Sequence, residues 1–230
     1  MDFALSDEQV AIADLAGRIL SEQLTTERLR EIEQTDDWFA ADTWAELAKA
    51  DLLGLSLPEA QGGGGYGFFE LALILEQVGR AVAPLPVLST LVLGALPLAE
   101  FGSTDQQAAW LPGVIDGSVI LTAALSEGRD GLPPEVPATT ATASASGDGW
   151  TISGTKQLVP GAVHADRVLV PARTGDGTST VFLVDPAAAG VTLEVNRGPN
   201  LEPLTTMTFD GVAVGCGDVV GDADGGAAIT

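Results

Sequence analysis

The chain has 230 residues and a formal charge of −22, from 10 basic and 32 acidic side chains, with 46% hydrophobic residues. This length predicts one or two domains with a sizeable core, and the charge argues against nucleic-acid binding because no basic stripe exists to release phosphate counterions. Cys216, the single cysteine, excludes an internal disulfide, and no signal peptide or uninterrupted apolar run of ~20 residues is present, so we expect a soluble, cytoplasmic protein without membrane contact.

The first half of the chain has the apolar spacing of helices. Ser6 opens a capping box that predicts a helix to about Gln23. A second helix is expected over residues 26–34, where Glu and Arg recur at helical spacing. Apolar residues between 44 and 52 form the face of a third helix, which we expect Gly54 to end.

The next segment alternates loops and helices. Residues 57–67 contain a run of glycines and a proline, which predicts a loop; no Lys-Ser/Thr follows it, so a phosphate-binding loop is not expected. Residues 68–82 keep helical apolar spacing, and residues 87–101 are apolar on nearly all sides and should form the most buried helix. A second capping box at Ser103 begins a sixth helix. These helices predict an all-α domain over residues 1–117.

From Val119 onward the pattern changes to short β-branched runs separated by glycine-containing turns. We predict a small antiparallel β-barrel or sandwich domain over residues 118–220, which makes the whole an α+β fold. Residues 221–230 are interpreted as the start of a further helical domain. The predicted strands are 119–125, 139–145, 150–152, 168–172, 181–184, 191–195 and 206–209.

Three stretches in this order are distinctive: A-L-S-E-G after an apolar strand, G-W-T-I-S-G-T-K-Q-L-V-P, and A-D-R-V-L-V. The arrangement resembles an acyl-CoA dehydrogenase, and the resemblance covers nearly the whole chain. It implies α,β-desaturation of an acyl-CoA thioester, with FAD as hydride acceptor and electron-transfer flavoprotein as electron acceptor. It also implies a C-terminal four-helix domain, absent from this chain, that carries the catalytic glutamate. No residue from 1 to 230 matches that base, so no catalytic residue is assigned.

The resemblance assigns flavin contacts to four positions, and the assignment is incomplete. Leu125 and Ser126 fall where the family's leucine and threonine meet the flavin, and Ser126 keeps a hydroxyl. Leu158 stands where an aromatic side chain stacks on the flavin. Pro160 replaces a hydroxyl residue and lacks a backbone donor. A glycine, Gly128, also replaces the proline that follows the family's glutamate.

Two positions are candidate substrate contacts. Ala123 and Leu158 both stand where the family has aromatic side chains. Their smaller size would admit a bulky acyl group such as a shortened sterol chain. Arg129 has two interpretations: it could meet a phosphate of coenzyme A, or lie exposed beside Asp130.

With these substitutions at the flavin positions, the chain resembles the flavin-degenerate subunit of actinobacterial heterotetrameric acyl-CoA dehydrogenases that act on sterol side chains. We therefore expect an α2β2 enzyme of fatty-acid or steroid catabolism in which FAD is shared with or held by an unlike subunit. Two alternatives stay open: a self-sufficient homo-oligomeric acyl-CoA dehydrogenase, and a non-catalytic acyl-CoA-binding or scaffold protein of the same fold.

Three other residues have structural interpretations. His164 is the only histidine, so no two-imidazole metal site can form within the chain, and a surface or turn position is expected. Lys156 should pack its aliphatic stem at a strand end. Cys216, between two glycines, is interpreted as a small buried filler.

Overall fold

The computed structural model describes residues 4–128 and 132–230. Their positions divide into two compact units: residues 1–88 with 110–119, and residues 89–109 with 120–230. Each unit is described by itself. None of the described helices is both long enough and apolar enough to cross a lipid bilayer.

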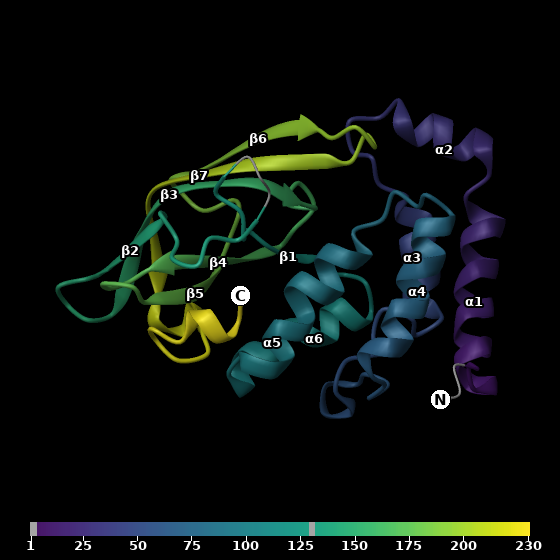
Figure 1. Cartoon of the computed structure of the whole chain (residues 1–230), viewed down its shortest axis with the longest axis horizontal. Helices are drawn as coiled ribbons and strands as arrows, with labels where there is room; N and C mark the ends of the chain where they lie inside the picture. Colours follow the sequence, from purple (N-terminus) through teal and green to yellow (C-terminus); the bar gives the residue numbers. More distant parts are fainter. Residues whose placement is uncertain (1–3, 129–131) are drawn as a thin grey trace. The chain divides into compact units, whose positions relative to one another are not determined.

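The first unit is helical. It contains α1 (Asp7–Gln23), α2 (Thr26–Glu33), α3 (Ala41–Lys49), α4 (Phe68–Arg80) and the second half of α6 (Thr104–Ile115). The capping box predicted for α1 is present: Ser6 Oγ accepts from the Gln9 N–H at 3.2 Å, and Gln9 Oε1 accepts from the Ser6 N–H at 3.0 Å. Helices α1 and α4 lie side by side (Figure 1).

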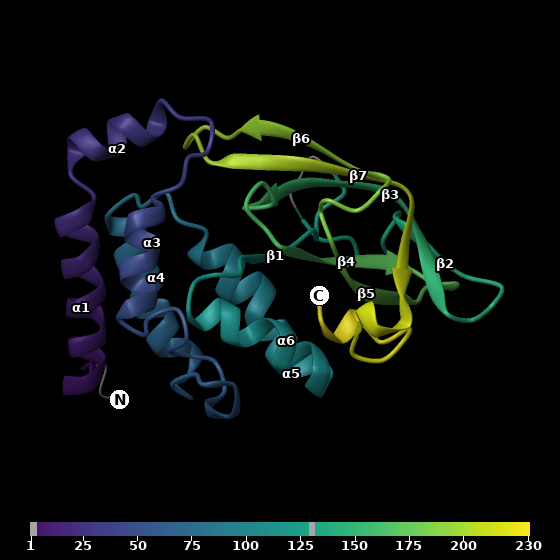
Figure 2. The same ribbon diagram turned by 180° about the vertical axis from the view of Figure 1, so that it is seen from behind.

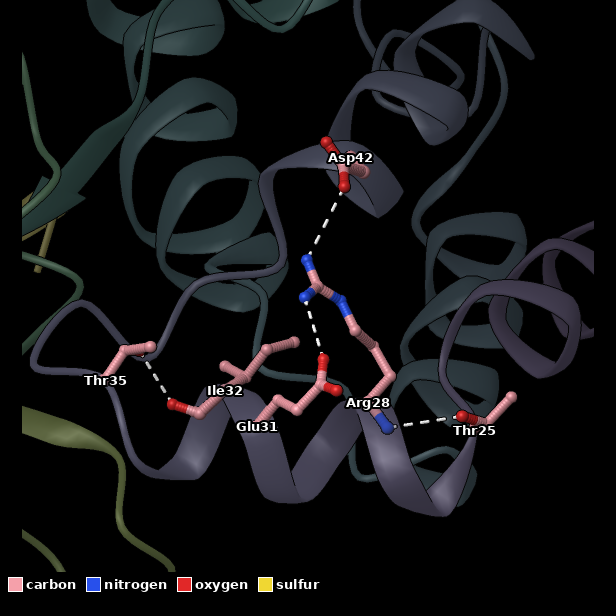
Figure 3. Close-up of polar contacts among 6 residues, drawn as sticks. All are labelled: Thr25, Arg28, Glu31, Ile32, Thr35 and Asp42. Carbon is pink, nitrogen blue, oxygen red and sulfur yellow. Dashed lines mark hydrogen bonds and ion pairs between the residues drawn. The ribbon is translucent and has the colours of Figure 1, made fainter.

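Helix α2 is held by short-range polar contacts at both ends (Figure 3). Thr25 caps its first turn by accepting from the Arg28 N–H, and the Thr35 hydroxyl donates to the Ile32 carbonyl at 2.7 Å after its last turn. The Arg28 guanidinium lies 3.3 Å from Glu31 and 3.5 Å from Asp42 of α3. These pairs are exposed, so each contributes little to stability.

The end of α3 differs from the prediction. The helix stops at Lys49, where Asp51 takes a left-handed conformation (φ 59°) and the Leu52 N–H donates to the Leu47 carbonyl, the bond of a Schellman-type helix end. Gly54 has another role: a Cβ there would lie 2.8 Å from the Ile115 side chain. Glycine at 54 therefore permits close packing rather than ending a helix.

The helical segment of the second unit also differs. A single buried helix is predicted over residues 87–101, but the structure has a π-helix, η2 (Leu88–Ala95), followed by α5 (Leu96–Phe101). Gly94 packs against β1, since a Cβ at Gly94 would lie 2.4 Å from the Leu121 Cβ. Several side chains of this segment are only half-buried, so it is not buried on all sides as predicted.

The rest of the second unit is one eight-stranded sheet in the order β6-β7-β3-β2-β4-β5-β8, with β1 beside β4 (Figure 2). All seven predicted strands are present, β3 and β7 are much longer than predicted, and β8 was missed. The strands are β1 (Leu121–Ala123), β2 (Thr140–Ala143), β3 (Gly149–Pro160), β4 (Arg167–Arg173), β5 (Ser179–Val184), β6 (Val191–Arg197), β7 (Pro203–Gly215) and β8 (Val219–Val220).

Most pairings are antiparallel, but β4 is parallel to both β1 and β2. The core of this unit lies on the face that carries Ile152, Phe182, Met207 and Val212. The prediction of a helical domain followed by an antiparallel-dominated β domain is thus confirmed, with β1 and β2 as its parallel exceptions. The boundaries at residues 117 and 220 stay predictions.

Two further features of the sheet matter below. Edge strand β6 is exposed along nearly its whole length. After β8 the chain forms a short 3-10 turn, η4 (Gly226–Ala228). The prediction that residues 221–230 begin a further helical domain stays a prediction.

Candidate functional site

The site is built around the loop that follows β1, residues 124–128. The Ala124 N–H donates to the Leu169 carbonyl at 2.9 Å, which continues the β1–β4 ladder by one residue. The Ser126 carbonyl accepts from the Gln157 N–H at 2.8 Å. Thr122, fully buried in β1, donates its hydroxyl to the Pro160 carbonyl at 2.7 Å. The loop is therefore held between β4 and β3.

A β-bulge shapes the facing part of β3. Lys156 pairs with Met207, but the next pairing is Val159 with Thr205, so β3 carries one extra residue here. The bulge lets both Lys156 and Val159 point into the core, while Leu158 stays 39% exposed with a left-handed φ of 54°. Bulges of this kind re-aim side chains and are common beside functional sites.

The bulge places a lysine in the interior. The Lys156 side chain is 0% exposed, and its Nζ lies 2.8 Å from Oε1 of Glu127, whose side chain is 10% exposed. The angles of this contact fall outside those of a hydrogen bond, so it is an ion pair by distance. The Glu127 carboxylate also accepts from the backbone N–H groups of Ala138 and Thr139, the latter at 2.9 Å.

These surroundings shift both pKa values. Burial raises the pKa of the Glu127 carboxyl, but the Lys156 ammonium and the donors of Thr139 and Ala138 outweigh burial, so that pKa lies below its usual value. Burial lowers the pKa of the Lys156 ammonium, and Glu127 opposes this only in part. Each side chain thus favours the charged form of the other.

An apolar cavity of about 160 Å³ lies in the same unit. Half-buried side chains of η2 and α5 form one wall, and strands β1, β4 and β5 form another. Its lining residues are Val92, Leu93, Pro97, Ala123, Leu125, Leu169, Pro171, Val181, Ile229 and Thr230. The loop after β1 thus contributes to the cavity through Leu125 and to the ion pair through Glu127.

The match to known families decides the identity of this fold. A family model described as the N-terminal domain of acyl-CoA dehydrogenase matches residues 6–118, and one described as the middle domain matches residues 122–212. The chain belongs to the acyl-CoA dehydrogenase family.

Individual relatives agree. Acyl-CoA dehydrogenase FadE28 of Mycobacterium tuberculosis (strain ATCC 25618 / H37Rv) is 37% identical, over 96% of this chain and 56% of the relative. The solved ChsE4-ChsE5 complex from Mycobacterium tuberculosis superposes with a TM-score of 0.89 at 30% identity, covering 100% of this chain and 61% of that one. A variant of the Tcur3481-Tcur3483 steroid ACAD gives 0.85 at 39% identity, over 95% and 58%. This acyl-CoA dehydrogenase chain therefore spans little more than half the length of these relatives.

The structure separates the predicted site residues into two groups. Ala123 (3% exposed) and Leu125 line the cavity together. Ser126 (8% exposed) contacts the β3 bulge through its carbonyl, Leu158 lies within that bulge, and Pro160 ends β3. Their roles as cofactor and substrate contacts stay predictions. Arg129 lies outside the described residues.

Acyl-CoA dehydrogenases use FAD, and the four flavin positions of this chain fit that group poorly. Pro160 has neither a hydroxyl nor an N–H, and its carbonyl already accepts from Thr122. Leu158 offers an aliphatic side chain in place of an aromatic face. Ser126 keeps its hydroxyl, but the residue is almost completely buried. These four positions therefore offer few contacts to a bound flavin.

Three interpretations of individual residues are settled by the structure. Lys156 does not lie at a strand end, because the length of β3 and its bulge bury it completely. Cys216 is exposed rather than buried, since β7 ends there in a surface turn. His164 lies in the turn between β3 and β4, as predicted. Within residues 4–128 and 132–230, no group of acidic, histidine or cysteine side chains could hold a metal ion.

Sequence reasoning missed the Glu127–Lys156 pair. The signal available was the match of Glu127 and Lys156 to two family motifs, A-L-S-E-G and G-T-K. Nothing in either motif shows that the two side chains meet, because their contact depends on the register of β3.

Proposed function

We propose that this chain is a subunit of a flavin-dependent acyl-CoA dehydrogenase that works with an unlike subunit, and that the unlike subunit holds FAD and supplies the catalytic base. The observation that carries the proposal is the state of the flavin positions. Pro160 has no hydroxyl or N–H to donate to a flavin, and Leu158 has no aromatic ring to stack on one. The surrounding fold is nevertheless that of the family. In such an assembly this chain contributes substrate-facing surface rather than the reacting groups.

The relatives support an assembly of unlike subunits. One structural relative is a complex of two named chains, ChsE4 and ChsE5, and another is the Tcur3481-Tcur3483 steroid ACAD. By analogy we propose an α2β2 enzyme of steroid or fatty-acid side-chain oxidation. Electron-transfer flavoprotein is the electron acceptor that the family resemblance implies.

The volume of the cavity limits the size of the acyl segment that it could hold. Its volume of about 160 Å³ equals roughly five water-sized volumes, which is too small for a fused ring system but suits a short aliphatic segment. Ala123 in its wall leaves space that a larger side chain would fill. We propose that the cavity takes the aliphatic end of a side chain while any ring system lies outside it.

Two other functions are compatible with the fold. A self-sufficient homo-oligomer would need a flavin site built without Pro160 and Leu158. A non-catalytic acyl-CoA-binding or scaffold protein would use the cavity alone. Flavin content and turnover separate these from the proposed hetero-oligomer.

The first test measures flavin content. The protein expressed alone should bind FAD weakly or not at all, while co-expression with an unlike, flavin-competent acyl-CoA dehydrogenase subunit should give a yellow complex. The variant L158W/P160T restores one stacking surface and one hydroxyl, so FAD affinity of the isolated protein should rise roughly tenfold or more. Leu201→Trp is the matched control, because Leu201 is also exposed (37%) with a left-handed φ of 67°. A stoichiometrically flavinylated homo-oligomer would refute the proposal.

The second test measures desaturation by the co-expressed complex. Steroid-type and straight-chain acyl-CoA esters are compared, and the candidate glutamate of each subunit is replaced by glutamine in turn. Activity should depend on the partner's acid and favour branched or steroid-type esters. Dependence on an acid of this chain, or a preference for short straight chains, would contradict the proposal.

A further inference from the structure

Three backbone segments meet at Glu127. Its carboxylate accepts from the N–H groups of Ala138 and Thr139, just before β2, and it faces Lys156 of β3. The neighbouring Ser126 carbonyl accepts from the Gln157 N–H. A single side chain thus ties the loop after β1 to the start of β2 and to β3.

This arrangement is a costly way to stabilise a fold. Desolvating a carboxylate and an ammonium offsets most of their attraction, and a well-packed apolar pair of similar volume is often as stable or more so. Lys156 is fully buried and its ammonium makes no well-aligned hydrogen bond among the described residues. In some proteins, what a buried ion pair adds over an apolar pair is a fixed position for the groups that it joins.

The groups held in position belong to the candidate site. Leu125 lines the cavity, Ser126 lies at the β3 bulge, and Leu158 follows Gln157 within that bulge. Glu127 directly follows Ser126 in the loop, and Lys156 directly precedes Gln157 in the bulge. A shift of the loop would move the cavity wall and the bulge together.

We propose that Glu127 and Lys156 are positioning residues, which hold the loop 124–128 against the β3 bulge and so fix the cavity wall at Leu125 and the backbone at Ser126 for the ligand of the assembled enzyme. The proposal rests on the proposed function for the identity of that ligand. The Lys156 side chain is fully buried and the Glu127 carboxylate is taken up by Lys156 and two backbone N–H groups, so neither is assigned a contact with the ligand. Their effect on binding therefore passes through the backbone of residues 125 and 126.

The test uses the co-expressed complex carrying E127Q/K156M in this chain. This double variant removes both charges at nearly constant volume, and the amide oxygen of a glutamine in place of Glu127 can still accept a backbone N–H, so the fold should survive. The control is E46Q/K49M, because Lys49 and Glu46 form an exposed ion pair of similar length, 2.7 Å. Two quantities are measured: hydrogen exchange of the Gln157 amide, and the dissociation constants of butyryl-CoA and FAD.

In the double variant the Gln157 amide should exchange faster, while core amides such as that of Phe182 stay protected. The dissociation constant of at least one probe should rise roughly 10- to 100-fold, as displacements of a site's backbone commonly cause. The control variant should match the wild type in both measurements.

Other results overturn the proposal in different ways. Unchanged exchange and affinity would make the pair purely structural. Faster Gln157 exchange with unchanged affinity would show that the loop does not shape the ligand site. A wild-type complex that binds neither probe would contradict the proposed function itself, and this failure is recognised because it is present before any substitution.

Discussion

Leu158 holds a backbone conformation that L-amino acids rarely adopt, with φ at 54°. This left-handed conformation costs a non-glycine residue roughly 1–2 kcal/mol, and the side chain is 39% exposed, so it recovers only part of that cost by packing. Strain at a bulge beside a candidate site is typical of positions where geometry serves function.

We expect Leu158→Gly to raise the free energy of unfolding by about 1 kcal/mol, because glycine adopts this conformation without a Cβ clash. Gln157→Gly, one residue earlier and outside the left-handed region, should lower it. Urea denaturation of both variants checks this. Equal losses in the two variants would show that Leu158 is not strained.

Glu127 gives stability a pH dependence of known sign. Its pKa is lowered on folding, so its contribution is fully present above the pKa of the unfolded chain and is lost as the pH falls through the lower folded-state pKa. Lys156 has a pH dependence of its own: because folding also lowers its pKa, stability rises with pH between its folded-state pKa and its unfolded-state pKa.

We therefore expect the melting temperature of the wild type to fall more steeply below about pH 4.5 than that of E127Q/K156M. Thermal denaturation between pH 3 and pH 7 measures both slopes. Other carboxylates with lowered pKa, such as Asp148 and Asp224, remain in both proteins and cancel in the comparison. Parallel curves would exclude a contribution from Glu127.

At the scale of single elements, two glycines in helical segments differ in the space that a side chain would have. A Cβ at Gly94 in η2 would lie 2.4 Å from the Leu121 Cβ, whereas a Cβ at Gly79 in α4 has no heavy atom within 4 Å. Both sites belong to regular helical backbone, so the difference lies in packing alone.

Gly94→Ala should lower the free energy of unfolding by about 1–3 kcal/mol, the usual cost of overpacking. Gly79→Ala should raise it by about 0.5–1 kcal/mol, because alanine favours a helix interior. Chemical denaturation distinguishes the two directions. A stabilising Gly94→Ala would mean that η2 can move away from β1 at little cost.

The elements that sequence predicted well depend on local signals. Ser6 and Ser103 mark their helix starts because each capping box is complete within four residues. The π-helix η2, the bulge at Leu158 and the full lengths of β3 and β7 depend on partners far away in the chain. The candidate site shows the same dependence on distant partners. Sequence motifs are enough to name Ser126 and Leu158 as candidates, but the contact between Lys156 and Glu127 depends on the register of β3 in the sheet.

For the whole molecule, the formal charge of −22 is a source of self-repulsion. At low ionic strength the Debye length is ~30 Å, and it falls to ~8 Å near 0.15 M salt. We expect the melting temperature of the isolated protein to rise as sodium chloride is raised across this range. Scanning calorimetry at fixed pH measures the trend, and a flat or falling curve would mean that acidic groups are already well separated or paired.

The exposed edge strand β6 has a consequence for how two copies of the chain meet each other. Its outer row of N–H and C=O groups is a template on which another strand can add, and Leu193 (36% exposed) and Val195 (50% exposed) offer an apolar side to the newcomer. Glu194 stands at the middle of the strand. If two copies paired antiparallel in the centred register, the two Glu194 carboxylates would face each other, and like charges directly opposite destabilise such pairing. Glu194 therefore disfavours the centred antiparallel pairing of two copies through β6.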